Sequence, residues 1–305
     1  MSNHQLTYFY LLSPLHTGGT SQEGNVVGIA REAHTNFPYL PSSSIRGRFR
    51  ADVDFDPNDP DTDLNARIRR IQLFGPDLKD IQDRDFTELY EAQTDRKLAQ
   101  LEQGSIWIGD GSILWMPVPS ISHGVIWVSC PLLLQRWTRL QFGKQIDVPE
   151  YSSNLPRKGT VYLKDATIPG QKLQDWQTNW QTFVPHSHET SIENVLVVPN
   201  RYCETLIQMS LWRQVKVKLD DRKVVTDGSF RYEEAIPPDT LMYFPWGTTV
   251  QTQNRQERQQ DFASLLADRT IVQMGGQESL GRGFVRQWTG TQNSTENTQT
   301  QTAQT

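Results

Sequence analysis

Cysteine is scarce in this 305-residue sequence, and long apolar runs are missing. The two cysteines, Cys130 and Cys203, cannot build a disulfide framework or a four-cysteine zinc site. No stretch approaches the roughly 20 apolar residues that cross a bilayer, and the first residues lack the basic segment that opens a signal peptide. We therefore expect a cytoplasmic protein without a membrane segment.

Positive charge is also in the minority. The chain has 30 Lys and Arg against 35 Asp and Glu, a formal net charge of −5. This balance argues against a general basic coat that binds polyanions, although it leaves room for a local basic patch. Aromatic residues, in contrast, are plentiful: 9 Trp and 12 Phe can fill a core, so we expect a folded chain.

The order of apolar patterns predicts an α+β fold, because short strands and helices are interspersed along the chain. We expect strands at 6–12, 105–115 and 124–130, more strands from 195 to 244, and helices at 64–74, 86–101, 131–140 and 261–268. Residues 116–122, with two prolines, read as a connection. Residues 148–192, rich in Pro, Gln and Ser, predict an irregular insertion, and the polar tail 289–305 predicts disorder. We treat residues 1–288 as one domain.

Three basic elements stand out in this acidic chain. The first is PSSSIRGRFR, residues 41–50. Three serines predict an N-cap for a helix that begins near Ile45: Ser42, Ser43 and Ser44. Arg46 and Arg50, four residues apart, would point together, so the element is suited to bind an anion at a helix N-terminus. The alternative is an ordinary capped helix with solvated arginines.

The second element is a predicted β-hairpin over residues 214–234, where apolar residues alternate with lysines and Asp227-Gly228 signals a turn. Its cations are Lys216, Lys218, Arg222 and Lys223. Such a hairpin can lie along a phosphate backbone or between bases. The alternative is a surface hairpin that lysines keep soluble.

The third element is the glycine-rich segment MGGQESLGRGFV, residues 274–285. Its glycines allow main-chain N–H groups to turn inward, and Arg282 adds charge. It is not a Walker loop, since no Lys-Ser/Thr follows the glycines, and it lacks the spacing of a dinucleotide fingerprint. A turn without function is the alternative, but three such elements together favour a localised groove for a polyanion.

In this order the elements resemble the RAMP superfamily of CRISPR-associated proteins, and within it the repeated backbone subunit of type III-B (Cmr-type) effector complexes. The resemblance rests on five segments: SPLHTGG, the PSSSIRGRFR segment, the strand block at 109–137, the basic hairpin and QMGGQESLGRGFV. Together they cover most of residues 6–288.

The resemblance implies an RRM-like (ferredoxin-like) palm with a protruding hairpin, the thumb, and insertions. It implies copies stacked head to tail along a guide RNA (crRNA) in a ribonucleoprotein of antiviral defence, together with target RNA and other type III subunits. Each thumb would interrupt the guide–target duplex at regular intervals. The implied RNA-binding residues are His16, Arg31, Ser42, Ser43, Ser44, Arg46, Arg48, Arg50, Gly275, Gly276, Gly281 and Arg282, with the thumb cations Lys216, Lys218, Arg222 and Lys223.

The resemblance also implies a loop aspartate that supports metal-dependent cutting of target RNA, with Mg²⁺ or Mn²⁺. Here the loop reads TSQEGNVVGIARE, and Val26 stands near the expected position. Valine can neither bind a cation nor accept a proton. Glu23 is the substitute if the loop is shifted. We therefore hypothesise RNA binding without cutting; the alternatives are a metal-dependent endoribonuclease of the same fold and an unrelated α+β interaction module.

Overall fold

The computed structural model describes residues 4–19, 22–23, 26–53, 60–98, 103–164, 166–187, 190–218, 220–226, 230–252 and 254–290, with main chain alone for 22–23 and 60–63. The helices are α1 Ser42–Ala51, α2 Pro60–Phe74, α3 Leu78–Gln82, α4 Arg84–Thr94, α5 Pro131–Phe142, α6 Asn200–Ser210 and α7 Arg255–Ala267, with the 3₁₀ turns η1 Gly170–Lys172, η2 Trp180–Phe183 and η3 Glu278–Leu280. The strands are β1 His4–Leu11, β2 Gln22–Glu23, β3 Val26–Val27, β4 Tyr39–Leu40, β5 Ile106–Ile108, β6 Gly111–Ser120, β7 Gly124–Ser129, β8 Ser152–Ser153, β9 Thr160–Leu163, β10 Ala166–Pro169, β11 Gln174–Asp175, β12 Val195–Val197, β13 Trp212–Lys216, β14 Arg231–Ala235, β15 Leu241–Thr248, β16 Ile271–Gln273 and β17 Phe284–Thr289. None of these helices is long and apolar enough to cross a membrane.

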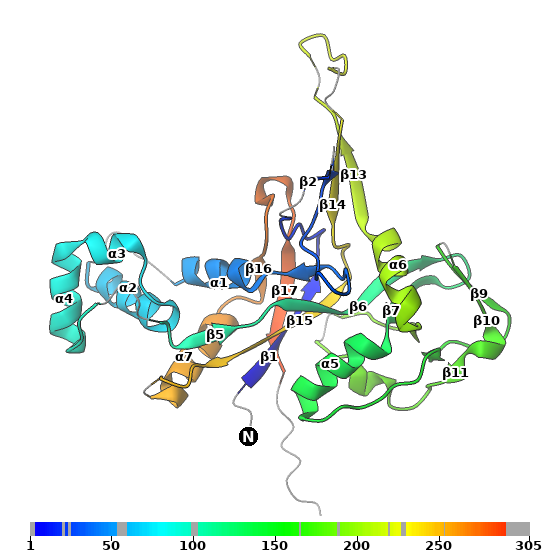
Figure 1. Ribbon diagram of the computed structural model, residues 1–305, viewed down its shortest axis with the longest axis horizontal. Coiled ribbons are helices and arrows are strands. Elements are labelled where there is room, and N and C mark those ends of the chain that lie inside the picture. The colour runs from blue at the N-terminus through cyan, green and yellow to red at the C-terminus, as the bar shows by residue number, and fades with distance from the viewer. Residues whose placement is uncertain are drawn as a thin grey trace, which may run out of the picture.

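Four strands at the centre of the main sheet run in the order β17-β1-β15-β6, and each is antiparallel to its neighbours (Figure 1). Between β1 and β6 the chain forms α1, and between β15 and β17 it forms α7. This βαββαβ order is that of a ferredoxin-like fold. The predicted α+β class with a ferredoxin-like core is confirmed.

Both faces of this sheet are covered. Alternate residues of β1 point to opposite sides, so neighbouring residues contribute to different cores. Phe9 packs on Phe244 with ring centroids 5.0 Å apart, under α1 and α7. Phe49 of α1 lies 6.3 Å from the same Phe244 ring. On the opposite face Trp137 of α5 donates its indole N–H to the Tyr8 hydroxyl at 3.1 Å. The aromatic residues thus form cores on both sides of the sheet.

A helical lobe of α2, α3 and α4 stands to one side of the sheet (Figure 1). Its small apolar core includes Ile71 and Tyr90. Its polar side is held by the buried carboxylate of Asp80, which accepts from Arg67 at 2.9 Å and from Arg70 at 2.7 Å. The lobe therefore has a core of its own and a buried ion-pair cluster.

Residues 148–192 are not irregular, contrary to the prediction. β8 pairs with β11 and β12, and the β9–β10 hairpin pairs with the end of β6, so the segment extends the main sheet. Val161 and Leu163 of β9 are buried in the main core. The polar composition misled the prediction because these short strands bury few side chains: two each in β8 and β9, one in β10 and none in β11.

β6 runs through the two prolines that were predicted to form a connection. The main-chain N–H of Trp127 points away from β6, to the carbonyl of Asn194 at 2.7 Å. The opposite residue in the pair, Pro117, therefore needs no N–H on that side. β15 pairs with β6 only as far as Trp115, so the other edge of β6 has no partner from β15 at Pro117 and Pro119. The prolines fit at these positions for that reason.

Three predicted elements also need correction. α6 lies where strands were predicted, and it buries Cys203, Leu206 and Ile207 at helical spacing. α4 ends at Thr94 rather than near 101, since Asp95 takes a left-handed conformation with φ 53°. α7 begins at Arg255, six residues before the predicted start.

A second sheet of four strands, in the order β13-β14-β3-β2, rises from the main sheet. Its β13–β14 hairpin projects beyond the rest of the molecule in Figure 1. The predicted turn at 227–228 and most of the predicted tail, residues 291–305, lie outside the described residues.

Candidate nucleic-acid interface

The predicted basic hairpin is present as β13 and β14. β13 and β14 pair from Trp212 opposite Ala235 to Lys216 opposite Arg231. Beyond the strands the chain reverses at Asp220, whose carboxylate accepts the N–H of Arg222 at 2.9 Å and the N–H of Val224 at 2.8 Å. The predicted thumb cations Arg222 and Lys223 are exposed at this far end, and Lys218 is exposed on the way to it.

At the base of the hairpin, buried glutamates of β14 neutralise the cations. The Glu233 carboxylate lies 2.8 Å from the Lys216 ammonium and 3.1 Å from the Arg282 guanidinium. The Arg282 guanidinium also lies 4.5 Å from the ring centre of Trp212. Arg282 is 3% exposed, so in this structure it is an internal ion-pair partner.

Glu234, the next residue of β14, also neutralises two cations. Its carboxylate lies 2.5 Å from Arg31 and 3.0 Å from Arg213. Arg31 also donates to the side-chain oxygen of Gln208 on α6, and the ring Nδ1 of buried His16 lies 3.0 Å from the Glu234 main-chain oxygen. We call Arg31, Arg213, Lys216, Glu233, Glu234 and Arg282 the hairpin-base cluster.

The serine segment is built differently from the prediction. α1 begins at Ser42, three residues early, with Pro41 at the N-cap and no side-chain cap. The N–H of Ser42 donates to the Asp110 carboxylate at 2.7 Å, and the N–H of Ser44 donates to the Pro41 oxygen at 2.9 Å. The predicted serine cap is therefore wrong: a carboxylate from the β5–β6 connection takes the position where an anion would meet the first N–H.

Arg46 and Arg50 do lie together, as their spacing predicts, but both donate to main-chain oxygens. The acceptors are Phe74 at 2.8 Å and Ile106 at 3.1 Å for Arg46, and Gly75 at 2.6 Å for Arg50. The Phe74 and Gly75 oxygens lie at the C-terminal end of α2, where the helix dipole favours a cation. Burial, and then the charge of Arg50, lowers the pKa of Arg46. Arg48 pairs with the buried carboxylate of Asp52 at 2.8 Å. Arg46 and Arg50 thus join α1 to the end of α2 and to β5, whereas the Arg48 pair stays at the C-terminal end of α1.

The glycine-rich segment packs against the LHTGG turn. Gly275 has φ 72°, and a Cβ there would lie 2.3 Å from the His16 oxygen. The N–H of Gly276 donates to that same oxygen at 2.9 Å. Gly281 has φ 73° and open space around it. Gly275 is thus required for a close approach of two main chains, while Gly281 is required only for its backbone angle.

The loop with the expected aspartate forms β2 and β3. Val26 lies opposite Tyr232 of the hairpin in a parallel pairing and opposite Glu23 in the β2–β3 pairing. The side chain of Glu23 lies outside the described atoms. The carboxylates of β14, Glu233 and Glu234, are each already paired with two cations. Among the described residues no group of three His, Cys, Asp or Glu is placed to hold a metal ion.

The structure therefore brings together only part of the predicted set. His16, Arg31, Lys216, Arg282 and the Gly275–Gly276 turn meet at the base of the hairpin, whereas the arginines of α1 point toward α2, β5 and Asp52. The sequence analysis missed Glu233 and Glu234, since it counted cations alone. In a hairpin, cross-strand pairing of opposite charges is the signal that would have found them.

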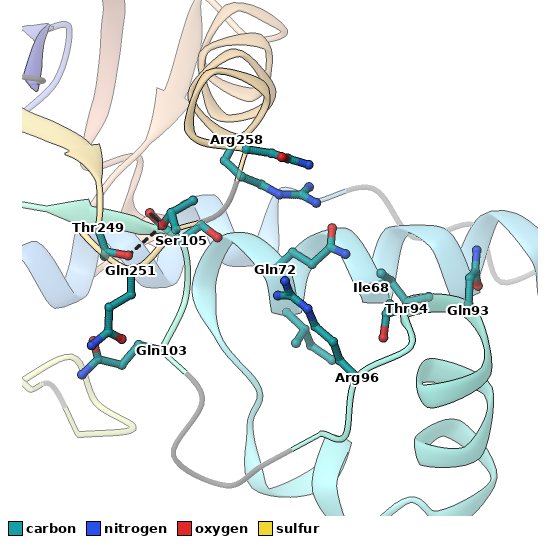
Figure 2. A pocket seen from close by; sticks show the side chains of 13 residues that line it. Ile68, Gln72, Gln93, Thr94, Arg96, Gln103, Ser105, Thr249, Gln251 and Arg258 are labelled. Atoms are coloured by element: carbon teal, nitrogen blue, oxygen red, sulfur yellow. Dashed lines mark hydrogen bonds between the residues drawn. The ribbon is translucent and has the colours of Figure 1, made fainter.

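A large polar cavity lies elsewhere, between the helical lobe and the start of α7. Its volume is about 680 Å³, and Figure 2 shows Gln72 and Arg96 from the lobe, with Gln251 and Arg258 from the region around α7, lining it. None of the described lining residues is one of the predicted RNA-binding residues. The cavity and the hairpin-base cluster are thus separate features.

Comparisons with known proteins bear on the family and the fold. The family described as the RAMP superfamily matches residues 8–286. The chain is 25% identical over 300 residues to the CRISPR system Cmr endoribonuclease Cmr4 of Pyrococcus furiosus, which covers 92% of this chain and 94% of that protein.

Two solved structures share the fold. The crystal structure of oligomeric Cmr4 from Pyrococcus furiosus has a TM-score of 0.63 at 22% identity, covering 95% of this chain and 98% of that chain. The cryo-EM structure of the type III-B Cmr-beta complex bound to cognate target RNA has a TM-score of 0.69 at 16% identity, covering 94% and 97%. Because the family match extends over nearly the whole length, this chain belongs to the RAMP superfamily.

Proposed function

We propose that this chain is a repeated backbone subunit of a type III CRISPR effector complex, where it holds guide RNA and spaces the target RNA paired to it. The similarity to Cmr4 over 92% of the chain carries this proposal. The Pyrococcus furiosus Cmr4 structure is oligomeric and the Cmr-beta structure is bound to cognate target RNA. We assign this chain the same kinds of partner: guide and target RNA, further copies of itself, and other subunits of the complex, in the cytoplasm.

The hairpin supports this role through its charge distribution. Arg222 and Lys223 are exposed at its far end, whereas the cations of the hairpin-base cluster are neutralised by Glu233 and Glu234. Exposed cations attract phosphates, and a base held by ion pairs keeps the hairpin at a fixed angle. A rigid hairpin with a basic end is suited to interrupt a duplex at a constant spacing.

The same proposal makes the chain an RNA holder rather than a cutter. No carboxylate occurs from Gly24 to Ala30, and Val26 in β3 offers no atom that could bind a metal or accept a proton. The competing function, a metal-dependent endoribonuclease, depends on Glu23, which lies opposite Val26 in the β2–β3 pairing.

The test uses the assembled, guide-loaded complex with a labelled complementary RNA, in Mg²⁺ and separately in Mn²⁺. We expect tight binding and an intact target. Evenly spaced products that disappear in the Glu23→Ala variant would replace the holding role with the endoribonuclease. A matched RNA without complementarity to the guide serves as the control for contaminating nucleases.

Purification distinguishes the proposed RNA-binding subunit from the remaining alternative, an α+β interaction module unrelated to RNA binding. A backbone subunit co-purifies with its partner subunits and with RNA, which gives a high ratio of absorbance at 260 nm to that at 280 nm. A preparation that contains partner subunits and no RNA would contradict the proposal.

A further inference from the structure

A small aromatic cavity lies at the N-terminal end of α6, the helix whose other end leads into the hairpin. Its volume is about 180 Å³. Tyr151 and Tyr202 line it together with Lys172 and the apolar side chains of Val198 and Leu206. We call this cavity the aromatic slot. It includes residues of the 148–192 segment, for which the sequence offered no role.

Tyr151 is held in the slot by a backbone conformation that tyrosine rarely adopts. Its φ is 66°, in the left-handed region, which costs a non-glycine residue about 1–2 kcal/mol. Its N–H donates to the Val197 oxygen at 2.6 Å and its oxygen accepts from Gln174 at 2.9 Å, so strands on both sides hold it. Strained residues of this kind gather at binding sites.

Two cations lie against the tyrosine rings. The Lys172 ammonium is 6.0 Å from the ring centre of Tyr151, and the Arg201 guanidinium is 4.7 Å from the ring centre of Tyr202. Among the described residues that line the slot, none is Asp or Glu. The slot therefore combines an apolar, aromatic lining with one cation that lines it, Lys172, and a second cation against the Tyr202 ring, Arg201.

The size of the slot limits its ligand to about one planar ring system, such as a single nucleobase. Sites that enclose a whole small molecule measure roughly 300–1,000 Å³, more than the 180 Å³ found here. Aromatic faces that stack a base, beside cations that hold its phosphate, are the usual means of binding single-stranded nucleic acid. We propose that the aromatic slot binds one unpaired nucleobase of RNA, with the adjoining phosphate held by Lys172 and Arg201.

The position of the slot fits an RNA strand that passes the hairpin. α6 has 11 residues and is therefore about 16 Å long. Gln208, near its C-terminal end, contacts Arg31 of the hairpin-base cluster, while Tyr202, near its N-terminal end, lines the slot. A strand displaced at the hairpin could reach the slot within a few nucleotides. This inference rests on the proposed function, because it supplies a second binding site for the same RNA.

The experiment places 5-iodouridine at successive positions of the guide and, separately, of the target RNA in the assembled complex. After irradiation, cross-linked peptides are identified by mass spectrometry. We expect cross-links to Tyr151 or Tyr202 from unpaired positions at a regular spacing. Tyr202→Ala should weaken RNA binding at least about 5-fold, since removal of the ring on which one base stacks costs a factor of roughly 5 to 150.

Matched variants separate the slot from general effects. Tyr151→Asn removes the ring and keeps a residue that tolerates positive φ. Lys172→Ala should lower the slope of log affinity against log salt by about 1, because one cation fewer then faces a phosphate. Tyr162→Ala changes a tyrosine of β9 that is 45% exposed and does not line the slot, so it should leave RNA binding unchanged.

The outcomes are distinct. RNA bound with unchanged affinity by Tyr202→Ala and Tyr151→Asn, without cross-links to the slot, overturns the inference and leaves the proposed function standing. Failure of the unaltered complex to bind RNA overturns both. If the Tyr202→Ala subunit fails to assemble in the absence of RNA, the slot contacts a protein neighbour, and this result overturns the proposal that it binds a nucleobase.

Discussion

The guanidinium of Arg282 lies 3.1 Å from the carboxylate of Glu233, and their side chains are 4% and 9% exposed. A charge so buried needs its partner, because the surrounding water that would otherwise stabilise it is excluded. This pair shows that a basic residue of the glycine-rich segment serves first to join that segment to the hairpin. The cations at the far end of the hairpin, Arg222 and Lys223, are in contrast exposed.

Removal of Glu234 should destabilise the protein. Glu234→Gln leaves Arg31 and Arg213 without their shared carboxylate, and loss of one partner of a buried pair costs about 2–4 kcal/mol when the other partners are partly exposed. Urea unfolding at pH 7 measures the change. Glu257→Gln is the control: its carboxylate is 61% exposed and 3.8 Å from Arg258, so the change should stay within about 0.5 kcal/mol. Equal effects of the two substitutions would contradict the assigned role of the hairpin-base cluster.

Two glycines of one segment should respond differently to alanine. A Cβ at Gly283 would lie 1.8 Å from the Met274 oxygen, whereas Gly281 has open space, and both have positive φ. Gly281→Ala should cost about 1–2 kcal/mol for its backbone angle alone. Gly283→Ala adds a main-chain clash and should cost more than about 3 kcal/mol or prevent folding. Thermal unfolding compares the two variants. A Gly283→Ala protein as stable as Gly281→Ala would show that the main-chain segments at Gly283 and Met274 can move apart.

Asp110 should act as a cap of α1 supplied from outside the helix. Asp110→Ala removes the acceptor for the Ser42 N–H and should cost about 1 kcal/mol, the typical cost of losing an N-cap. Asp110→Asn keeps an acceptor oxygen at the same place and should recover most of this stability. Chemical unfolding of the two variants measures the difference. If both variants were as stable as the unaltered protein, the 2.7 Å bond would contribute nothing to stability.

The helical lobe should lose stability in acid through Asp83. A hydrogen bond from Arg67, followed by the Phe86 N–H, lowers the pKa of Asp83. A carboxylate with a lowered folded pKa stabilises the fold above its unfolded pKa of about 3.9, and the contribution is lost as pH falls through the folded pKa. Asp83→Asn should therefore be less stable than the unaltered protein at pH 6, and the gap should close near pH 2. Unfolding midpoints across this range test it; a gap independent of pH would assign the effect to something other than the charge.

The far end of the hairpin should carry the salt-dependent part of RNA binding. Arg222→Ala combined with Lys223→Asn, which keeps a residue suited to the φ of 61° at position 223, should lower the slope of log affinity against log salt by about 1–2. Binding at several salt concentrations by the guide-loaded complex gives the slope. Arg255→Ala, an exposed residue at the start of α7, should leave it unchanged. A slope unaffected by the double substitution would move the phosphate-binding positions elsewhere.

Local patterns carried much of the fold. The aromatic run of β1, the helical spacing in α2 and α5, and the alternation of β13 all predicted the elements that form. These patterns lie within short segments of the sequence. The period of the apolar residues in each segment indicates whether a helix or a strand buries them on one side. The predictions failed where the structure depends on pairing between strands. For example, β6 continues through Pro117 because of how β7 and β15 pair with it.

Composition, periodicity and motif order need no knowledge of the folded chain, and they were enough to predict an acidic α+β protein with a basic hairpin and a likeness to the RAMP superfamily. Which cations face solvent became clear only in the folded chain. Arg31 and Arg282 looked the same in sequence as Arg222, yet the first two are neutralised by Glu234 and Glu233 and the third is exposed. The reason is that the strength of a charge depends on its partners and on the water around it, and folding alone brings those partners together.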